Sequence, residues 1–129
     1  MNNTGFRQAV AQALTTVGEV AAGDWQLHAA PPDLVDPPAY VLDWAEPMNS
    51  LASMCTDTAE LVVVAVAARF SDAAANYPTV EAMVDEAKPV LAAAGLRSWQ
   101  TLRPAAFPMG QVTYLAARMH IRYPIDTGG

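Results

Sequence analysis

The sequence is poor in the residues from which catalytic and metal sites are usually built. It holds one cysteine, Cys55, and two histidines, His28 and His120. A single cysteine excludes an internal disulfide and fits a reducing compartment. The sequence contains no nucleophile elbow, catalytic-cysteine signature, glycine-rich phosphate loop or calcium-loop spacing of carboxylates. We therefore expect no enzyme, no catalytic residues, no metal site and no cofactor.

Long apolar runs are also absent. The longest, Leu61–Ala68, has eight residues, whereas a membrane span needs about 18 or more. Met1–Thr4 lacks a basic region followed by an apolar core, so no signal peptide is expected. The length predicts one domain over residues 1–129, with a frayed tail at about 125–129.

Charged residues are scarce, at 16% against 53% hydrophobic residues, and positive charge is nearly missing from the first half. Residues 1–60 carry a net charge of −7, with Arg7 as the one base, whereas residues 61–129 carry +1. The apolar excess predicts burial between subunits. The uneven charge predicts a head-to-tail contact, with solvated loops as the alternative. The acidic total disfavours nucleic acid as the main partner.

An N-terminal helix is predicted from apolar residues that recur at steps of four and three. Its apolar positions are Phe6, Val10, Leu14, Val17 and Ala21. Asn3 or Thr4 can cap its start, and Gly18 or Gly23 can end it. The apolar face is expected to cover a sheet.

A second helix, at about Thr79–Ala94, has the clearest helical periodicity in the chain. Its apolar positions are Val80, Met83, Val84, Ala87, Val90 and Leu91. Asn76 or Thr79 is expected to cap its start, and Gly95 to end it. Pro89 removes one helical hydrogen bond, so a kink or break is expected there.

The sheet is predicted from one fully apolar strand and several alternating ones. Leu61–Phe70 is β-branched and apolar on both faces, as in a central strand covered on both sides. Helices on one side only would leave its second face to a neighbouring subunit. Trp25–Ala29 and Tyr40–Trp44 alternate, and are predicted to pair as a hairpin across a Pro-rich connection. Glu46–Thr58 is predicted to be a loop, and Leu96–Leu102 to contain a short strand before a further Pro-containing connection.

The last predicted strand, Val112–Tyr123, ends at Pro124. Its core face comprises Thr113, Leu115, Ala117, Met119, Ile121 and Tyr123. The opposite face starts apolar and ends with Arg118, His120 and Arg122. Phosphate binding by this basic set is the alternative to an edge or subunit contact, but phosphate binding usually needs more positive charge. Together the elements predict an α+β fold with a mixed or antiparallel sheet of about four to five strands and two helices packed on it.

With its elements in this order, the chain resembles the tail terminator (tail completion) proteins of long-tailed bacteriophages. The matching segments are Phe6–Val17, Trp25–Trp44, Leu61–Phe70, Val80–Leu91 and Val112–Tyr123. The Ala- and Val-rich, Lys-poor composition is similar to that of phages of actinobacterial hosts. Pro89 and the Pro-rich Ala30–Ala39 connection depart from the family pattern.

The resemblance implies a structural virion protein at the head–tail junction, present in the host cytoplasm during assembly. Such a protein forms a ring of six subunits that caps the tail tube, stops its polymerisation and joins it to the head-completion complex. The implied partners are further copies of the chain, the major tail tube protein, a head-completion or stopper protein and the tape measure protein. DNA only passes through the ring, and no membrane is involved.

Two alternatives remain open. One is another neck component, namely a head–tail stopper or head–tail joining protein, although stoppers commonly have fewer helices. The other is a small α+β ligand-binding module or enzyme with a pocket between helix and sheet. Its pocket would be lined by Trp25, Trp44, Trp99 and Tyr40.

Contacts with partners or other subunits are expected from the Pro-rich connection, from the segment before the central strand and from the basic end of the last strand. The candidate contact residues are Asp33, Asp36, Tyr40, Met48, Leu51, Met54, Arg118, His120 and Arg122.

Overall fold

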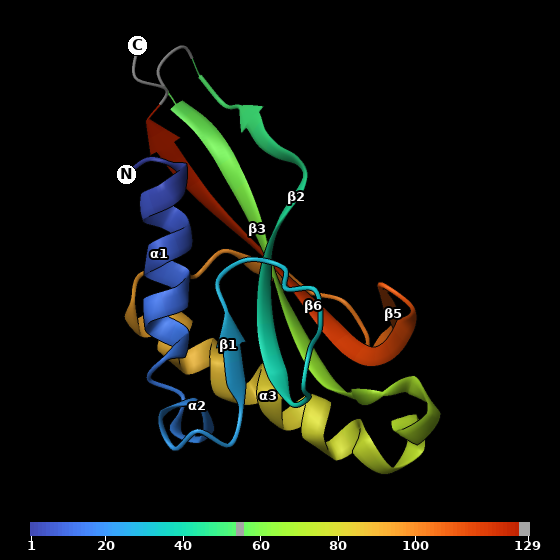
Figure 1. Ribbon diagram of the computed structural model, residues 1–129. Coiled ribbons are helices and arrows are strands. Elements are labelled where there is room, and N and C mark those ends of the chain that lie inside the picture. The colour runs from blue at the N-terminus through green and yellow to red at the C-terminus, as the bar shows by residue number, and fades with distance from the viewer. Residues whose placement is uncertain (54–55, 127–129) are drawn as a thin grey trace.

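The computed structural model describes residues 1–53 and 56–126, which form an α+β fold with a mixed sheet (Figure 1). Its elements are α1 (Asn3–Leu14), α2 (Gly18–Ala21), β1 (Gln26–His28), β2 (Ala39–Leu51), β3 (Thr56–Arg69), a 3-10 turn (Phe70–Asp72), α3 (Ala73–Ala93), β4 (Trp99–Thr101), β5 (Ala105–Met109) and β6 (Val112–Asp126). The strand order is β1-β2-β3-β6-β4, and β5 also pairs with β6. Only β1 and β2 are parallel among the described pairs. The predicted fold class is confirmed.

The N-terminal helix is shorter than its periodicity predicts. α1 ends at Leu14, and α2 is a separate turn of helix. The hydroxyls of Thr15 and Thr16 donate to the carbonyls of Gln12 and Ala13, which offers the backbone an alternative to the helical ladder. The cap is Asn2, which accepts from the Gly5 N–H at 2.8 Å, so the predicted caps Asn3 and Thr4 are wrong.

The second helix is longer than predicted, because α3 starts six residues before Thr79 and continues through Pro89. The expected break is therefore wrong. Pro89 is exposed, whereas the opposite side of the helix is held against the sheet. The buried side chains are Val80, Met83, Val84, Ala87 and Leu91. Asp72 is the N-cap residue, so the predicted caps are also wrong. Gly95 ends the helix as predicted, with φ of +82° and a hydrogen bond to Ala92.

β1 and β2 do not form the predicted hairpin. They are parallel, with Leu27 opposite Tyr40. Two parallel strands need a connection that brings the chain back to the end of the sheet at which the first strand began. The Pro-rich segment 29–38 makes this connection across one face of the sheet. Val35 of this segment is buried, and its carbonyl accepts a hydrogen bond from the Tyr114 hydroxyl at 3.2 Å.

Three proline-containing segments expected outside strands belong to the sheet. Glu46–Thr58 is mostly the end of β2 and the start of β3, where Ser50 pairs with Thr58. Ala105–Met109 forms β5, and β6 continues past Pro124 to Asp126. Ile125 is buried, so the described part of the predicted frayed tail is ordered within the sheet. In each case a long neighbouring strand provides pairing partners that local propensity does not anticipate.

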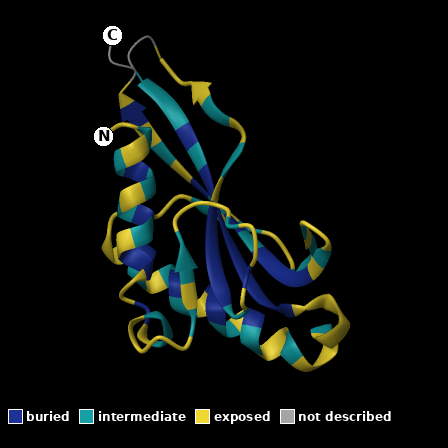
Figure 2. Ribbon diagram, viewed as in Figure 1, coloured by how far each residue is buried: buried dark blue, intermediate teal, exposed yellow. Residues whose placement is uncertain are grey.

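The central position of the apolar strand is confirmed, because β3 lies between β2 and β6. Alternate residues of β3 point to two faces. The helix face is covered by α1 and α3, and holds Leu61, Val63, Ala65 and Ala67. The open face holds Val62, Val64 and Val66. A neighbouring subunit is not needed to bury this open face, because Val35 and the β5–β6 hairpin already cover it (Figure 2).

The ends of β2, β3 and β6 extend beyond α3 as a three-stranded arm (Figure 1). The arm comprises residues 45–51, 56–60 and 122–126. The start of α1 lies alongside it, with the Phe6 ring stacked on Tyr123 at 5.4 Å and tilted against Trp44 at 6.2 Å. Among residues 1–53 and 56–126, nothing comparable covers the open face of the arm, which carries polar side chains.

Candidate partner interface

A polar cluster occupies the open face where the arm meets the body of the sheet. It consists of Glu60 on β3 with His120 and Arg122 on β6. Glu60 lies directly opposite Arg122, and His120 is opposite the next position of the same face, Val62. Period-two alternation therefore places all three side chains on one face.

Glu60 joins the two basic side chains. His120 Nδ1 lies 2.8 Å from one carboxylate oxygen, and Arg122 Nε donates to the other at 2.7 Å. A carboxylate only accepts, so His120 Nδ1 carries the hydrogen. These hydrogen bonds, from His120 first and then Arg122, hold the pKa of Glu60 below its ordinary value.

Arg122 keeps part of its hydrogen-bonding capacity for other molecules. Its side chain is 59% exposed and uses Nε for Glu60. Its two terminal amino groups have no partner within the described part of the chain. Pro47, Ser50 and Thr58 line a surface hollow of about 500 Å³ with Glu60 and Arg122. The arrangement presents donors and hydroxyls to a polar partner surface.

The predicted basic set is only partly brought together. His120 and Arg122 share Glu60, whereas Arg118 lies over the Phe107 ring, 4.7 Å from its centre. Glu60 was missed as a site residue because its role depends on strand register. Its signal in the sequence is an acidic residue directly before an apolar run.

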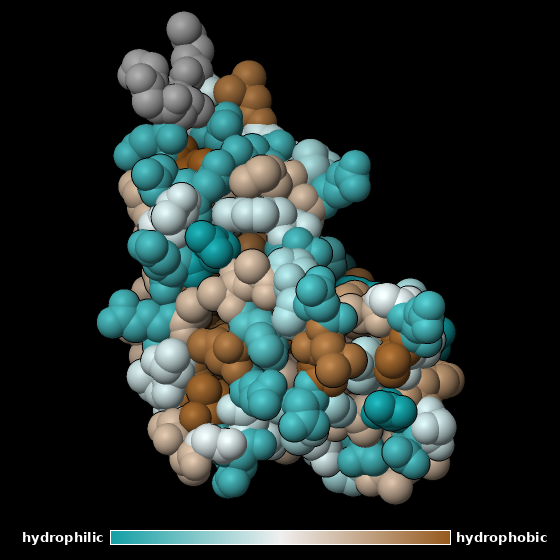
Figure 3. Space-filling view, viewed as in Figure 1, coloured by the Kyte–Doolittle hydropathy of each residue, from teal (hydrophilic) through white to brown (hydrophobic). Residues whose placement is uncertain are grey.

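The other predicted contact residues lie in different places. Asp33 and Asp36 are exposed on the Pro-rich connection, with Leu34 between them 70% exposed. Leu51 is 76% exposed at the end of the arm, where Figure 3 shows apolar atoms at the tip. Met54 lies outside the described residues, as does Cys55.

Tyr40 is not a surface contact residue. Its side chain is fully buried on the helix face, and its hydroxyl donates to the Met83 carbonyl at 2.6 Å. Burial, and secondarily the charges of Glu86 and Glu19, raise its pKa. Tyr40 therefore belongs to the core beneath α3 and not to the predicted contact surface.

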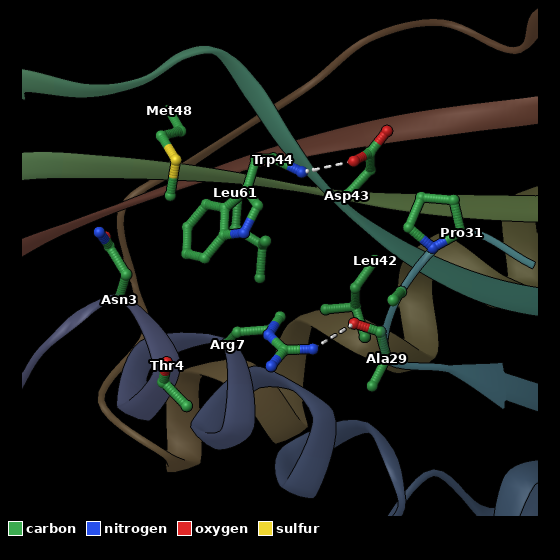
Figure 4. Close-up of a pocket in the computed structure, with 11 residues that line it drawn as sticks. Asn3, Thr4, Arg7, Ala29, Pro31, Leu42, Asp43, Trp44, Met48 and Leu61 are labelled. Atoms are coloured by element: carbon green, nitrogen blue, oxygen red, sulfur yellow. Dashed lines mark hydrogen bonds between the residues drawn. The ribbon is translucent and has the colours of Figure 1, made fainter.

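A cavity of about 250 Å³ lies between α1, the start of the Pro-rich connection and β2 (Figure 4). The wall formed by the sheet is mainly apolar, with Leu42, Trp44, Met48 and Leu61, and it also includes Asp43. Arg7 reaches across from α1 and donates to the Ala29 carbonyl at 3.2 Å. The Oδ1 atom of Asn3 is buried there without a partner in the described residues. Met48 thus lines a cavity rather than projecting from a loop.

The four aromatic residues of the ligand-binding alternative do not share one pocket. Trp44 lines the cavity beside α1, whereas Trp25 packs edge-on against the buried Tyr40 at 5.9 Å. Trp99 lies on β4, near His120 and Arg122. The predicted common pocket is therefore wrong.

A pair of acidic groups, Glu19 and Glu86, lies between α2 and α3. A hydrogen bond with Glu19 on α2, followed by burial and by the charge of Glu19, raises the pKa of Glu86 on α3. The described residues contain no group of three or more His, Cys, Asp or Glu side chains arranged to hold a metal ion. His28, the other histidine, contacts Gln26 through Nε2 at 3.2 Å.

None of the helices within residues 1–53 and 56–126 is long and apolar enough to cross a membrane. No protein-family model matches the chain, and a search of curated proteins finds no relative.

Proposed function

We propose that the chain is a structural subunit of a phage head–tail junction, and specifically a tail terminator. Copies of it form a six-membered ring that caps the tail tube, ends its polymerisation and joins it to the head-completion complex. It acts by binding rather than by catalysis, in the virion and in the host cytoplasm during assembly. Its partners are other copies, the tail tube protein, a head-completion protein and the tape measure protein.

The observation that carries this proposal is the three-stranded arm. It projects from a body whose own core is already buried, with polar residues on its open face and Leu51 at its tip. Exposed apolar side chains with a polar surround are typical of protein contact sites. Figure 3 also shows a hollow between the arm and the β5 turn, in which another protein surface could seat.

The helix content favours a terminator over a stopper among the neck proteins. α1 and α3 together cover the helix face, as the terminator resemblance implies, and α3 is 21 residues long. Stoppers are commonly richer in strand. The helix content thus separates the two structural roles independently of the cavity and of the polar cluster.

The test is the growth of tail tubes. Purified tube protein from the same phage is allowed to polymerise with and without the chain, and tubes are imaged by electron microscopy. The proposal expects six-fold rings at one tube end and an arrest of growth. Unchanged growth and bare tube ends would overturn it.

A variant sharpens this test. Leu51→Ser removes the apolar tip of the arm, and is expected to reduce capping while the thermal midpoint stays unchanged, because Leu51 is 76% exposed. Tyr77→Ser, on α3 and 44% exposed, is the matched control and should cap normally. Equal capping by both variants would exclude the arm tip as the tube contact.

The cavity beside α1 favours small-ligand binding as a second candidate function. It combines an apolar wall with the Arg7 guanidinium and a buried unpaired Asn3 oxygen. Concave apolar sites with few polar groups are typical of ligand pockets. A thermal-shift screen tests this, because a ligand that binds only the folded state raises its stability. A hit abolished by Arg7→Met but retained by Arg103→Met would support it.

A further inference from the structure

Both edges of the sheet present unpaired strand to solvent. β1 pairs with β2 only through Ala39–Val41, so within the described residues Leu42–Leu51 has no strand on that side. At the opposite edge, β4 pairs with β6 on its inner side and has no described strand on its outer side. Unpaired strand edges are ready templates for pairing with another chain.

The hydrogen bonds of β4 show which backbone groups face outward. The carbonyl of Ser98 accepts from Arg122 at 2.9 Å, and the Leu102 N–H donates to Arg118 at 2.8 Å. In an antiparallel pair such residues alternate along the strand. Trp99 and Thr101 therefore direct their N–H and C=O groups away from β6. The Thr101 hydroxyl is also buried without a partner among the described residues.

The two edges carry opposite charge. Residues 8–68, which include β1, β2 and most of β3, contain eight acids and no Lys or Arg. Residues 87–125, which include β4, β5 and most of β6, contain five Lys or Arg and no acid. In the strand order, β1 and β2 of the acidic segment lie toward one edge and β4 of the basic segment lies at the other, whereas β3 and β6 pair in the middle. Asp43 and Glu46 are exposed at the β2 edge, and Arg97 and Arg103 at the β4 edge.

Two acidic groups of α3 also lie near the β4 edge and equal Arg97 and Arg103 in number, so the basic character belongs to the strand and its flanking residues rather than to the whole edge region. Glu81 and Asp85 of α3 line a hollow with Arg103, without an ion pair to it. Leu102, next to Arg103, is 40% exposed, so apolar surface accompanies the charge. At the other edge, Glu46 and Pro47 of β2 are residue types that discourage pairing with unrelated strands. The β2 edge therefore requires a partner strand with complementary charge.

We propose that the β2 edge of one copy pairs with the β4 edge of the next copy, so that the sheet continues between subunits. This rests on the proposed function, since it names the contact that would build the ring. The contact is heterologous, because two different edges meet, and such contacts generate rings when the rotation closes. Opposite charge selects the partner edge and its register.

The test is the sedimentation of charge-reversal variants of the full chain. Glu46→Arg and Arg103→Glu change exposed side chains that make no described hydrogen bond. Each alone is expected to weaken self-association at least about tenfold. Both together in one chain are expected to restore it, because the reversed charges again face each other. A general loss of folding would not be rescued in this way, and circular dichroism of each variant checks it directly.

A backbone variant tests the strand pairing itself. Thr101→Pro removes an outward N–H but leaves the bonds of β4 to β6, and proline is tolerated at such edge positions. It is expected to give monomers at concentrations where the wild type assembles. An equimolar mixture of Glu46→Arg and Thr101→Pro should form dimers and nothing larger, since one intact edge remains in each.

The outcomes separate this contact from the proposed function. If the wild type forms rings and all three variants form them equally well, the edge contact is wrong and the ring is held by another surface. A wild type that stays monomeric at its highest attainable concentration also overturns the contact. Tube capping then decides the function independently.

Discussion

The two faces of one sheet behave differently, although the same strands build both. On the helix face β3 and β6 bury apolar side chains from the body of the sheet to the arm, where Ala59 and Ile125 are still buried. On the open face the apolar residues stop at Val62, and the polar cluster follows. The difference follows from what covers each face, because α1 reaches the arm whereas the Pro-rich connection does not. An uncovered strand end must carry side chains that water or a partner can satisfy.

The largest expected effect comes from two neighbouring valines of β3. Val63→Ala, on the helix face and fully buried, should lower the free energy of unfolding by about 2–3 kcal/mol through lost transfer energy and a cavity. Val62→Ala, 7% exposed at the apolar limit of the open face, should cost less. Urea unfolding of both variants measures the difference. Equal losses would mean that the two faces are packed equally tightly.

Next in size is the buried hydroxyl of the helix face. Tyr40→Phe leaves the Met83 carbonyl without its 2.6 Å bond from β2, and should cost about 1–2 kcal/mol. Tyr114→Phe is its counterpart on the open face, where the bond to Val35 is 3.2 Å long. A smaller loss is expected there. Thermal unfolding of both variants measures the two losses of stability. A larger loss for Tyr114→Phe than for Tyr40→Phe would contradict the expectation.

The polar cluster should make the free energy of unfolding depend on pH in the acidic range. The pKa of Glu60 is lowered in the folded state, so its contribution is present above its ordinary pKa and is lost as pH falls through the folded value. Glu60→Gln should remove this dependence and cost about 1 kcal/mol or less at neutral pH, because Arg122 is largely exposed. Urea unfolding as a function of pH measures it. A variant as acid-sensitive as the wild type would contradict the assignment.

The smallest effect is expected from Glu86, and it has the opposite sign. Its pKa is raised in the folded state, so the native chain binds more protons in the window above the ordinary value, and stability falls as pH rises through it. Glu86→Gln should stabilise the chain slightly at neutral pH, by a few tenths of a kcal/mol. The same series of urea unfolding at different pH shows whether Glu60 and Glu86 contribute pH dependences of opposite sign. Destabilisation by this variant would show that the Glu19–Glu86 pair is favourable.

Local sequence patterns predicted which helices and strands form better than they predicted where each begins and ends or which strands pair. The apolar periodicity of α3 located the helix, and the valine run located the central strand. Pro89 does not break α3, because its lost hydrogen bond faces solvent while the buried side of the helix stays packed. The strands around Pro47, Pro108 and Pro124 were missed for the converse reason, since their pairing depends on residues far away in the chain.

The candidate interface could be predicted only in part. Alternation along the last strand identified the basic side chains of Arg118, His120 and Arg122 on one face. Glu60 could not be joined to them without the register of β3 against β6. The exposure of Leu51 and Leu34 and the burial of Tyr40 depend equally on which surfaces the helices and the Pro-rich connection cover.

The sequence by itself determined the α+β class, the alternating faces and the division of charge between the two halves, because these follow from residue type and spacing along the chain. Only the tertiary structure decided that β1 is parallel to β2, that the chain itself covers the apolar part of the open face and that an acidic strand and a basic-flanked strand lie at opposite sheet edges. Those outcomes depend on pairings between distant residues, whose register and coverage no local pattern specifies.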